Sequence, residues 1–168
     1  FTGWSGDAAG VENPVQVTMD GPKTVTATFE RLDYPLTVQV VGQGTVAEQV
    51  VQGKTTDYPY ETIVELTATP VAGWTFTGWS GNASGVENPL RITMDGPKTV
   101  TATFERIAYP LTVDVVGEGT VAEQVVQGKT TDYPYETIVE LTATPAVGWT
   151  FTGWSGDAAG VENPVQVT

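Results

Sequence analysis

The sequence predicts an all-β protein built as a tandem array of small β domains, each of about 75 residues. Thr and Val account for 53 of the 168 residues, and both have β-branched side chains that fit a pleated sheet better than a helix. The motif Phe-Thr-Gly-Trp-Ser-Gly begins at Phe1, Phe76 and Phe151, so the chain repeats with a period of 75 residues. An array of this kind is expected to form a rod or filament, because each unit contacts mainly its neighbours.

The copies of the repeat are nearly identical. Residues 1–75 and 76–150 differ at only eleven positions, so the two copies must share one fold. Residues 151–168 then reproduce residues 1–18 without a change. The sequence therefore has the character of a window on a longer array.

The join between repeats is short. The segment Phe104–Pro110 contains no Gly/Ser tract and no long proline spacer, so the last strand of one repeat is expected to run almost directly into the next repeat. We place a complete repeat at residues 34–108. Residues 1–33 are then the C-terminal part of a preceding repeat, and residues 109–168 are the N-terminal part of a following one.

Four strands are expected in the first part of the complete repeat. They follow alternating apolar residues and are separated by turn-forming Gly, Pro and Asp residues. Their predicted ranges are Leu36–Val40, Thr45–Val51, Thr62–Thr69 and the aromatic segment Gly73–Trp79. Val64, Leu66 and Ala68 are expected to share the buried face of the third strand.

A β-hairpin is predicted at the end of the complete repeat. Its two strands would carry two matching apolar sets on either side of the turn Asp95–Lys98. The sets are Leu90, Ile92 and Met94 before the turn, and Val100, Ala102 and Phe104 after it.

Composition excludes several classes of function. The chain carries 20 Asp and Glu against 7 Lys and Arg, a net charge of −13, so a nucleic acid is not an expected partner. His and Cys are both absent, which removes the usual general base, the thiol nucleophile and any disulfide. We therefore expect no enzyme. No run of 18 apolar residues occurs, so no membrane insertion is expected in this segment.

The aromatic residues are the candidate contact sites. By strand parity, Trp74 and Phe76 share a face and are expected to fill the core, whereas Trp79 lies on the other face unless a bulge near Gly78 shifts the register. A ring on the outer face is available to pack against the next repeat or to stack on a glycan. The candidate inter-repeat or ligand contacts are Trp4, Trp79, Trp154, Tyr58, Tyr60, Tyr133 and Tyr135.

No cofactor is expected, and calcium is the one candidate ion. Asp114 and Glu118 flank the first turn of their repeat, but the equivalent residues are Gln39 and Gln43, so the site would not recur in every copy. An isopeptide link is a further candidate for stabilisation. It would join Lys54 or Lys98 to Asn88, although a lysine in a polar turn is ordinarily exposed to solvent.

Five sequence blocks in a constant order carry a family resemblance. They are Tyr-Pro-Leu-Thr-Val, Gly-x-Gly-Thr-Val, Leu-Thr-Ala-Thr-Pro, Gly-Trp-Thr-Phe-Thr-Gly-Trp-Ser-Gly and Thr-Val-Thr-Ala-Thr-Phe. In this order they resemble the divergent form of the internalin-type B-repeat over the whole of Tyr34–Glu105. The resemblance implies small β-rich domains, either β-sandwich or β-grasp-like, in an exported bacterial or archaeal protein at the cell surface. It implies no catalytic residues.

Two functions from different classes follow. The first is a structural extracellular array that acts as the stalk, spacer or fibre of a cell-surface adhesin or filament, with neighbouring repeats or identical chains as partners. The alternative is a module that binds a glycan or matrix component and gains strength from repetition. A filament would consist either of one continuous chain or of short chains that exchange strands head to tail.

Overall fold

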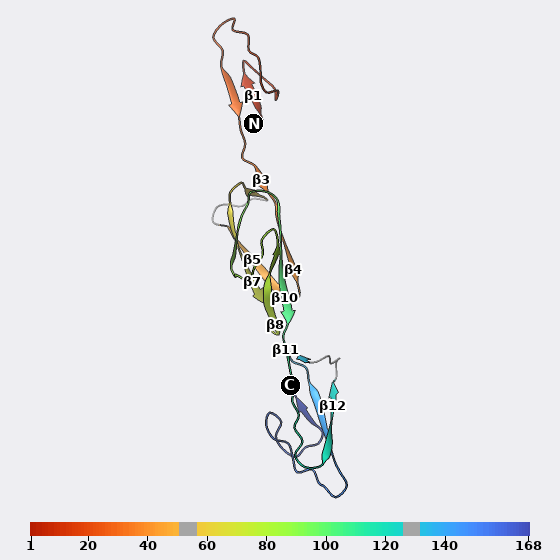
Figure 1. The fold of residues 1–168 in the computed structure, drawn as a ribbon. Coiled ribbons are helices and arrows are strands. Elements are labelled where there is room, and N and C mark those ends of the chain that lie inside the picture. Colours follow the sequence, from red (N-terminus) through yellow and green to blue (C-terminus); the bar gives the residue numbers. More distant parts are fainter. Residues whose placement is uncertain (51–56, 126–131) are drawn as a thin grey trace. The chain divides into compact units, whose positions relative to one another are not determined.

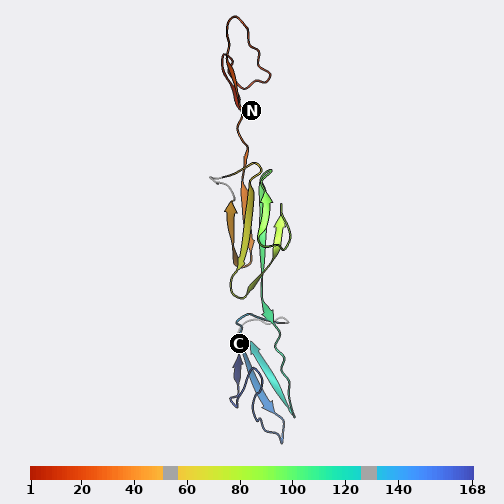
Figure 2. The ribbon, with the colours of Figure 1, turned by 90° about the vertical axis from the view of Figure 1, so that its left-hand side faces the viewer.

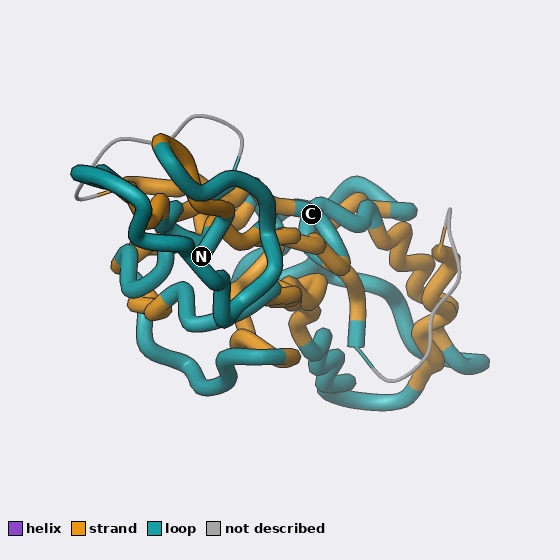
Figure 3. The backbone as a smooth tube through the Cα atoms, turned by 90° about the horizontal axis from the view of Figure 1, so that it is seen from above, coloured by secondary structure: helices purple, strands orange, loops and turns teal. Residues whose placement is uncertain are grey.

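The computed structural model describes residues 1–50, 57–125 and 132–168 (Figure 1). In these ranges every regular element is a β-strand, which confirms the all-β prediction. Figure 2 shows the strands of the complete repeat running along one another, and Figure 3 contains strands and loops only. No helix of the length and hydrophobicity that would cross a bilayer is found among the described residues.

The strands are short, and those that recur in successive repeats do so in the same order. Residues 1–33 contain β1 (Gly3–Gly6) and β2 (Val25–Thr28). The complete repeat contains β3 (Asp33–Tyr34), β4 (Leu36–Val41), β5 (Gly44–Val50), β6 (Tyr58–Pro59), β7 (Ile63–Pro70), β8 (Trp74–Gly81), β9 (Leu90–Thr93) and β10 (Lys98–Arg106). The last part contains β11 (Ala108–Tyr109), β12 (Gly119–Val125), β13 (Tyr133–Pro134), β14 (Val139–Pro145) and β15 (Val165–Val167). The four strands predicted first correspond to β4, β5, β7 and β8, and Val51 lies outside the described residues.

The complete repeat contains two three-stranded sheets and one short strand pair. One sheet has the order β5-β7-β9 and the other has the order β4-β10-β8, while β3 pairs with β6. In the first sheet β7 and β9 are antiparallel, with Val64 opposite Ile92 and Leu66 opposite Leu90. Each sheet has one apolar face, which is the arrangement typical of a β-sandwich.

The predicted hairpin at the end of the repeat is wrong. β9 belongs to the sheet of β7, whereas β10 is the central strand of the other sheet, so the turn Asp95–Lys98 connects two sheets instead of two paired strands. The alternation of apolar residues was recognised correctly, because Ile92, Met94, Val100, Ala102 and Phe104 are all buried. Such a pattern specifies a buried face but does not specify which strand lies beside it, since the alternation depends on the burial of one face and not on the identity of the neighbouring strand.

Contacts divide the chain into two compact units, and each unit has its own buried residues. Unit 1 comprises residues 1–39, 47–67 and 80–101, and unit 2 comprises residues 40–46, 68–79 and 102–168. The buried apolar residues of unit 1 are Ala8, Tyr58, Val64, Leu66, Ile92, Met94 and Val100. Those of unit 2 are Ala68, Trp79, Ala102, Phe104, Tyr133, Val139 and Leu141.

The aromatic side chains of β8 do not occupy the sides of the strand that strict alternation predicts. Trp79 is only 4% exposed, whereas Trp74 and Phe76 are half-buried. The rings of Phe76 and Trp79 lie 5.0 Å apart between centroids, so both point to the same side although they are three residues apart. The alternation is interrupted at Gly78, whose φ of 152° lies outside the ordinary strand region. The same ring pair recurs as Phe1–Trp4 and Phe151–Trp154, each at 5.1 Å.

We predict that Phe104→Ala destabilises the protein by about 3–5 kcal/mol, because its ring is 2% exposed and its removal leaves a cavity. The matched control is Phe29→Ala, the same residue of the repeat in a position that is 72% exposed. It should cost less than about 1 kcal/mol. Urea unfolding followed by tryptophan fluorescence measures both. Equal costs for the two variants would contradict the burial described above.

Candidate functional site: the junction between repeats

The described residues offer little for metal or covalent chemistry. No group of three or more His, Cys, Asp or Glu side chains gathers there as a metal site. Asp114 and Glu118 are both exposed, and calcium binding by this pair stays a prediction. Among the isopeptide candidates, Lys98 forms an ion pair with Asp95, and its hydrogen bond and positive charge lower the pKa of the Asp95 carboxyl. Lys54 lies outside the described residues.

Two of the candidate contact residues are core residues. Tyr58 is 1% exposed and Tyr133 is 6% exposed. Each hydroxyl donates a hydrogen bond of 2.6 Å, from Tyr58 to Glu48 Oε2 and from Tyr133 to Glu123 Oε2. These bonds satisfy the polar tip of a ring whose body is buried, as a buried tyrosine requires. Neither ring face is open to a ligand while the core is closed.

Trp4 and Trp154, two of the three equivalent tryptophans, each bind a loop of their own repeat. The indole of Trp4 donates to the carbonyl of Glu12 at 3.0 Å, and the indole of Trp154 donates to the carbonyl of Glu162 at 2.9 Å. The backbone of the same two residues also pairs with Gly10 and Gly160. Trp79 is buried, whereas Trp4 and Trp154 are half-buried and bonded to a loop of their own repeat. Sequence analysis did not predict this role, because the loop between each tryptophan and the carbonyl that it binds shows no periodic pattern of apolar residues.

The remaining candidates, Tyr60 and Tyr135, lie at the joins between repeats. The backbone N–H of Tyr60 donates to the carbonyl of Leu32 at 2.8 Å. In the next copy, the N–H of Tyr135 donates to the carbonyl of Ile107 at 2.9 Å. Leu32 and Ile107 are equivalent linker residues, so each join is bonded to the repeat that follows it. Arg31 adds a hydrogen bond from its guanidinium to the carbonyl of Tyr60.

The linker continues as a short strand beyond this bond. Asp33 and Tyr34 pair with Pro59 and Tyr58, and the equivalent strands β11 and β13 pair in the same register. The rings of Tyr34 and Tyr60 lie edge to face with centroids 6.4 Å apart. The Tyr-Pro-Tyr segment of each repeat therefore pairs with the incoming linker through its backbone, and in the complete repeat the contact of Tyr34 with Tyr60 is added.

The second linker is also bonded to the repeat that precedes it. The N–H of Ile107 donates to the carbonyl of Gly73 at 2.8 Å. A Cβ atom added at Gly73 would lie 2.5 Å from Cδ1 of Tyr135, so the tyrosine ring packs directly on the glycine backbone. Ile107 thus donates to one repeat and accepts from the next. This residue is the central point of the junction.

Each junction tyrosine lies at the second position of a strained turn. The N–H of Thr62 donates to the carbonyl of Pro59 at 2.9 Å, and Glu61 has a φ of 67°. This combination matches a type II β-turn, whose third position normally prefers Gly or Asn. The equivalent Glu136 has a φ of 63°. A glutamate in this region is disfavoured sterically, and the strain is retained in both copies.

Comparison with known proteins gives one family. A family model described as the divergent InlB B-repeat domain matches residues 1–33, 34–108 and 109–168. No curated protein and no solved structure matches the chain. The family match covers the whole chain, including both junctions described above.

We predict that the double variant Glu61→Gly/Glu136→Gly is more stable than the parent by about 0.5–1 kcal/mol per site, because glycine removes the steric cost of positive φ. The control is Glu61→Ala/Glu136→Ala, which removes the same carboxylates but retains the cost of positive φ. Thermal unfolding followed by circular dichroism distinguishes the two. Equal gains in both variants would mean that side-chain charge, and not the backbone, is responsible.

Proposed function

Since this chain belongs to the divergent InlB B-repeat family, we propose that it is a structural stalk or spacer at the cell surface, in which hydrogen-bonded junctions limit bending between repeats. The observation that carries the proposal is the double bonding of Ile107, which donates to Gly73 of one repeat and accepts from Tyr135 of the next. A linker bonded at both ends transmits the orientation of one repeat to the next better than a free Gly/Ser linker does.

The charge of the chain supports the same proposal. A net charge of −13 keeps a long array soluble and disfavours side-by-side association of arrays. Apart from the bond of the Arg31 guanidinium to the carbonyl of Tyr60, the junction contacts are made by backbone groups and rings, so they do not depend on salt as surface ion pairs do. Such a spacer would hold a functional head at a distance from an anchor, with extracellular localisation as the family suggests.

The alternative of glycan binding receives less support from the candidate residues. Seven aromatic residues are proposed as contacts. Tyr60 is the single exposed residue of these seven, with 41% of its surface accessible. Its ring already faces Tyr34. A platform for sugar stacking needs an open aromatic face, and the buried rings of Trp79 and Tyr58 do not provide one.

The stalk proposal predicts a defined increase in length. In small-angle X-ray scattering of arrays with increasing numbers of repeats, the maximum dimension should grow by roughly 30 Å per repeat, the diameter expected of a 75-residue globule. Growth in proportion to the square root of repeat number, as for a flexible coil, would refute the stalk. A glycan array probed with the same proteins tests the alternative, and binding that strengthens with repeat number would favour it.

The junction itself is tested with Tyr60→Pro/Tyr135→Pro. Proline fits the second position of a type II turn but has no N–H, so the bonds to Leu32 and Ile107 are lost while the turn is kept. The control Tyr60→Ala/Tyr135→Ala removes the same rings and keeps both N–H groups. We expect faster independent tumbling of the repeats in ¹⁵N relaxation for the proline variant than for the alanine variant. Identical relaxation in the two variants would show that these bonds do not restrain the junction.

A further inference from the structure

The first and the last long strands of the complete repeat are neighbours in one sheet. β4 follows the incoming linker after the short strand β3, and β10 continues directly into the outgoing linker at Ile107. The sheet order β4-β10-β8 places β4 beside β10. The two linkers of the repeat therefore lead into neighbouring strands, and tension between the linkers acts on the pair that these strands form.

Contacts at both ends of this pair show that β4 and β10 are parallel. Where the two strands begin, the N–H of Lys98 donates to the carbonyl of Pro35 at 3.1 Å. Where they end, Gly42 lies against the carbonyl of Phe104, and a Cβ atom added at Gly42 would collide with that oxygen. Beginning meets beginning and end meets end, so the incoming and outgoing linkers are attached at opposite ends of the strand pair.

The parallel orientation decides how tension acts on the ladder between the two strands. Force on the incoming linker pulls β4 toward its N-terminus, and force on the outgoing linker pulls β10 toward its C-terminus. The strands would have to slide past each other along their axes, so the evenly spaced bonds of the ladder are strained together and not in turn. The hydroxyl of Thr101 donates to Oε1 of Gln39 across the same pair, at 3.3 Å, and this bond is strained with them.

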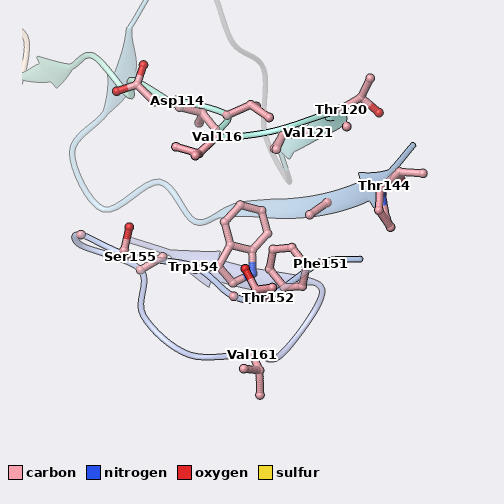
Figure 4. A pocket seen from close by; sticks show the side chains of 18 of the residues that line it. Asp114, Val116, Thr120, Val121, Thr144, Phe151, Thr152, Trp154, Ser155 and Val161 are labelled. Carbon is pink, nitrogen blue, oxygen red and sulfur yellow. The ribbon is translucent and has the colours of Figure 1, made fainter. Parts of the chain in front are cut away.

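β10 is also held along its other edge and on its inner face. Its other edge pairs with β8. The ring of Phe104 is buried and lies 5.6 Å from the ring of Phe76, between centroids. Phe76 belongs to the ring pair of β8, and Figure 4 shows the equivalent rings of Phe151 and Trp154 next to each other in the last part of the chain. Movement of β10 along its axis therefore breaks a second ladder and removes a buried ring from its neighbours.

We propose that the β4–β10 pair is the load-bearing element of the repeat, which resists unfolding when tension is applied through the two linkers. The proposal rests on the stalk function for the source of the tension, because a spacer between a head and an anchor is pulled through its linkers. It adds a property that a spacer of fixed length does not require, namely that the resistance has a direction. Pulled apart from the ends where both strands begin, the same ladder opens one bond at a time.

Two pairs of introduced cysteines apply the force in the two directions. The chain contains no cysteine, so each pair provides the only two attachment points. Leu32→Cys with Glu105→Cys pulls at the beginning of β4 and the end of β10. Leu32→Cys with Gly96→Cys pulls at the beginnings of both strands, since Gly96 lies in the turn before β10. Leu32 and Glu105 are exposed, and a Cβ atom added at Gly96 has no neighbour within 4 Å. The two variants share one attachment point and differ in which end of β10 is pulled.

Unfolding of the whole chain in optical tweezers, at one pulling speed, is the test. The Leu32/Glu105 pair should unfold the complete repeat at a force about twofold or more above that of the Leu32/Gly96 pair, because it strains the ladder bonds together. Urea unfolding is the control and should give equal free energies for the two variants, since forced unfolding reports a rate and not the equilibrium stability. Equal unfolding forces, or a lower force for the Leu32/Glu105 pair, would overturn the proposal.

The outcomes for the load-bearing pair and for the stalk are separable. Scattering measures the length of an array without tension, whereas the tweezers measure one repeat under tension. Regular growth in length together with equal unfolding forces would refute the load-bearing pair and leave the stalk standing. Coil-like growth together with a twofold ratio of forces would refute the stalk and support the load-bearing pair as a property of the repeat.

Discussion

The central strand of the β4-β10-β8 sheet is the element on which the rest of the repeat depends. β10 pairs along both of its edges, and its inner face contributes the buried residues Val100, Ala102 and Phe104. Its backbone also passes over glycines whose Cβ atoms would collide with it. A strand that forms two ladders and a large part of a small core has no substitute within its repeat. Its presence or absence therefore changes the structure of residues far from it in sequence.

The three copies of the repeat demonstrate this dependence directly. Residues 1–18 and 151–168 are identical, yet they fold differently. Residues 3–6 form β1 because β2 lies beside them, whereas the equivalent residues 153–156 contain only the isolated bridge of Trp154 to Gly160. Conversely, residues 165–167 form β15 on β14, and the equivalent residues 15–17 form no strand. Within residues 1–168, residues 3–6 pair with β2 and residues 165–167 pair with β14, so each half of the peptide forms a strand where its partner strand lies within these residues.

The junctions apply the same principle between repeats. A 75-residue domain without disulfides has a modest core, so contacts with its neighbours matter for its stability. Here the carbonyl of each linker accepts a hydrogen bond from the Tyr-Pro-Tyr segment of the repeat that follows, and the N–H of Ile107 donates to the preceding repeat. A glutamate with positive φ lies in the turn that this segment begins. The strained turn and the bonded linker recur in both copies. The same few backbone groups therefore join each linker to the repeat that follows it.

Local sequence determined the fold class, the repeat period, most strand positions and the buried face of β7. These features follow from β-branched composition, period-2 alternation and exact repetition, which are readable without a partner. Tertiary structure decided the rest. It assigned β9 and β10 to different sheets, turned Trp79 inward at Gly78, and placed Tyr58 in the core but Tyr60 at the junction. The physical reason is that alternation marks which side chains are buried, whereas the partner of each backbone edge is chosen only when the strands meet.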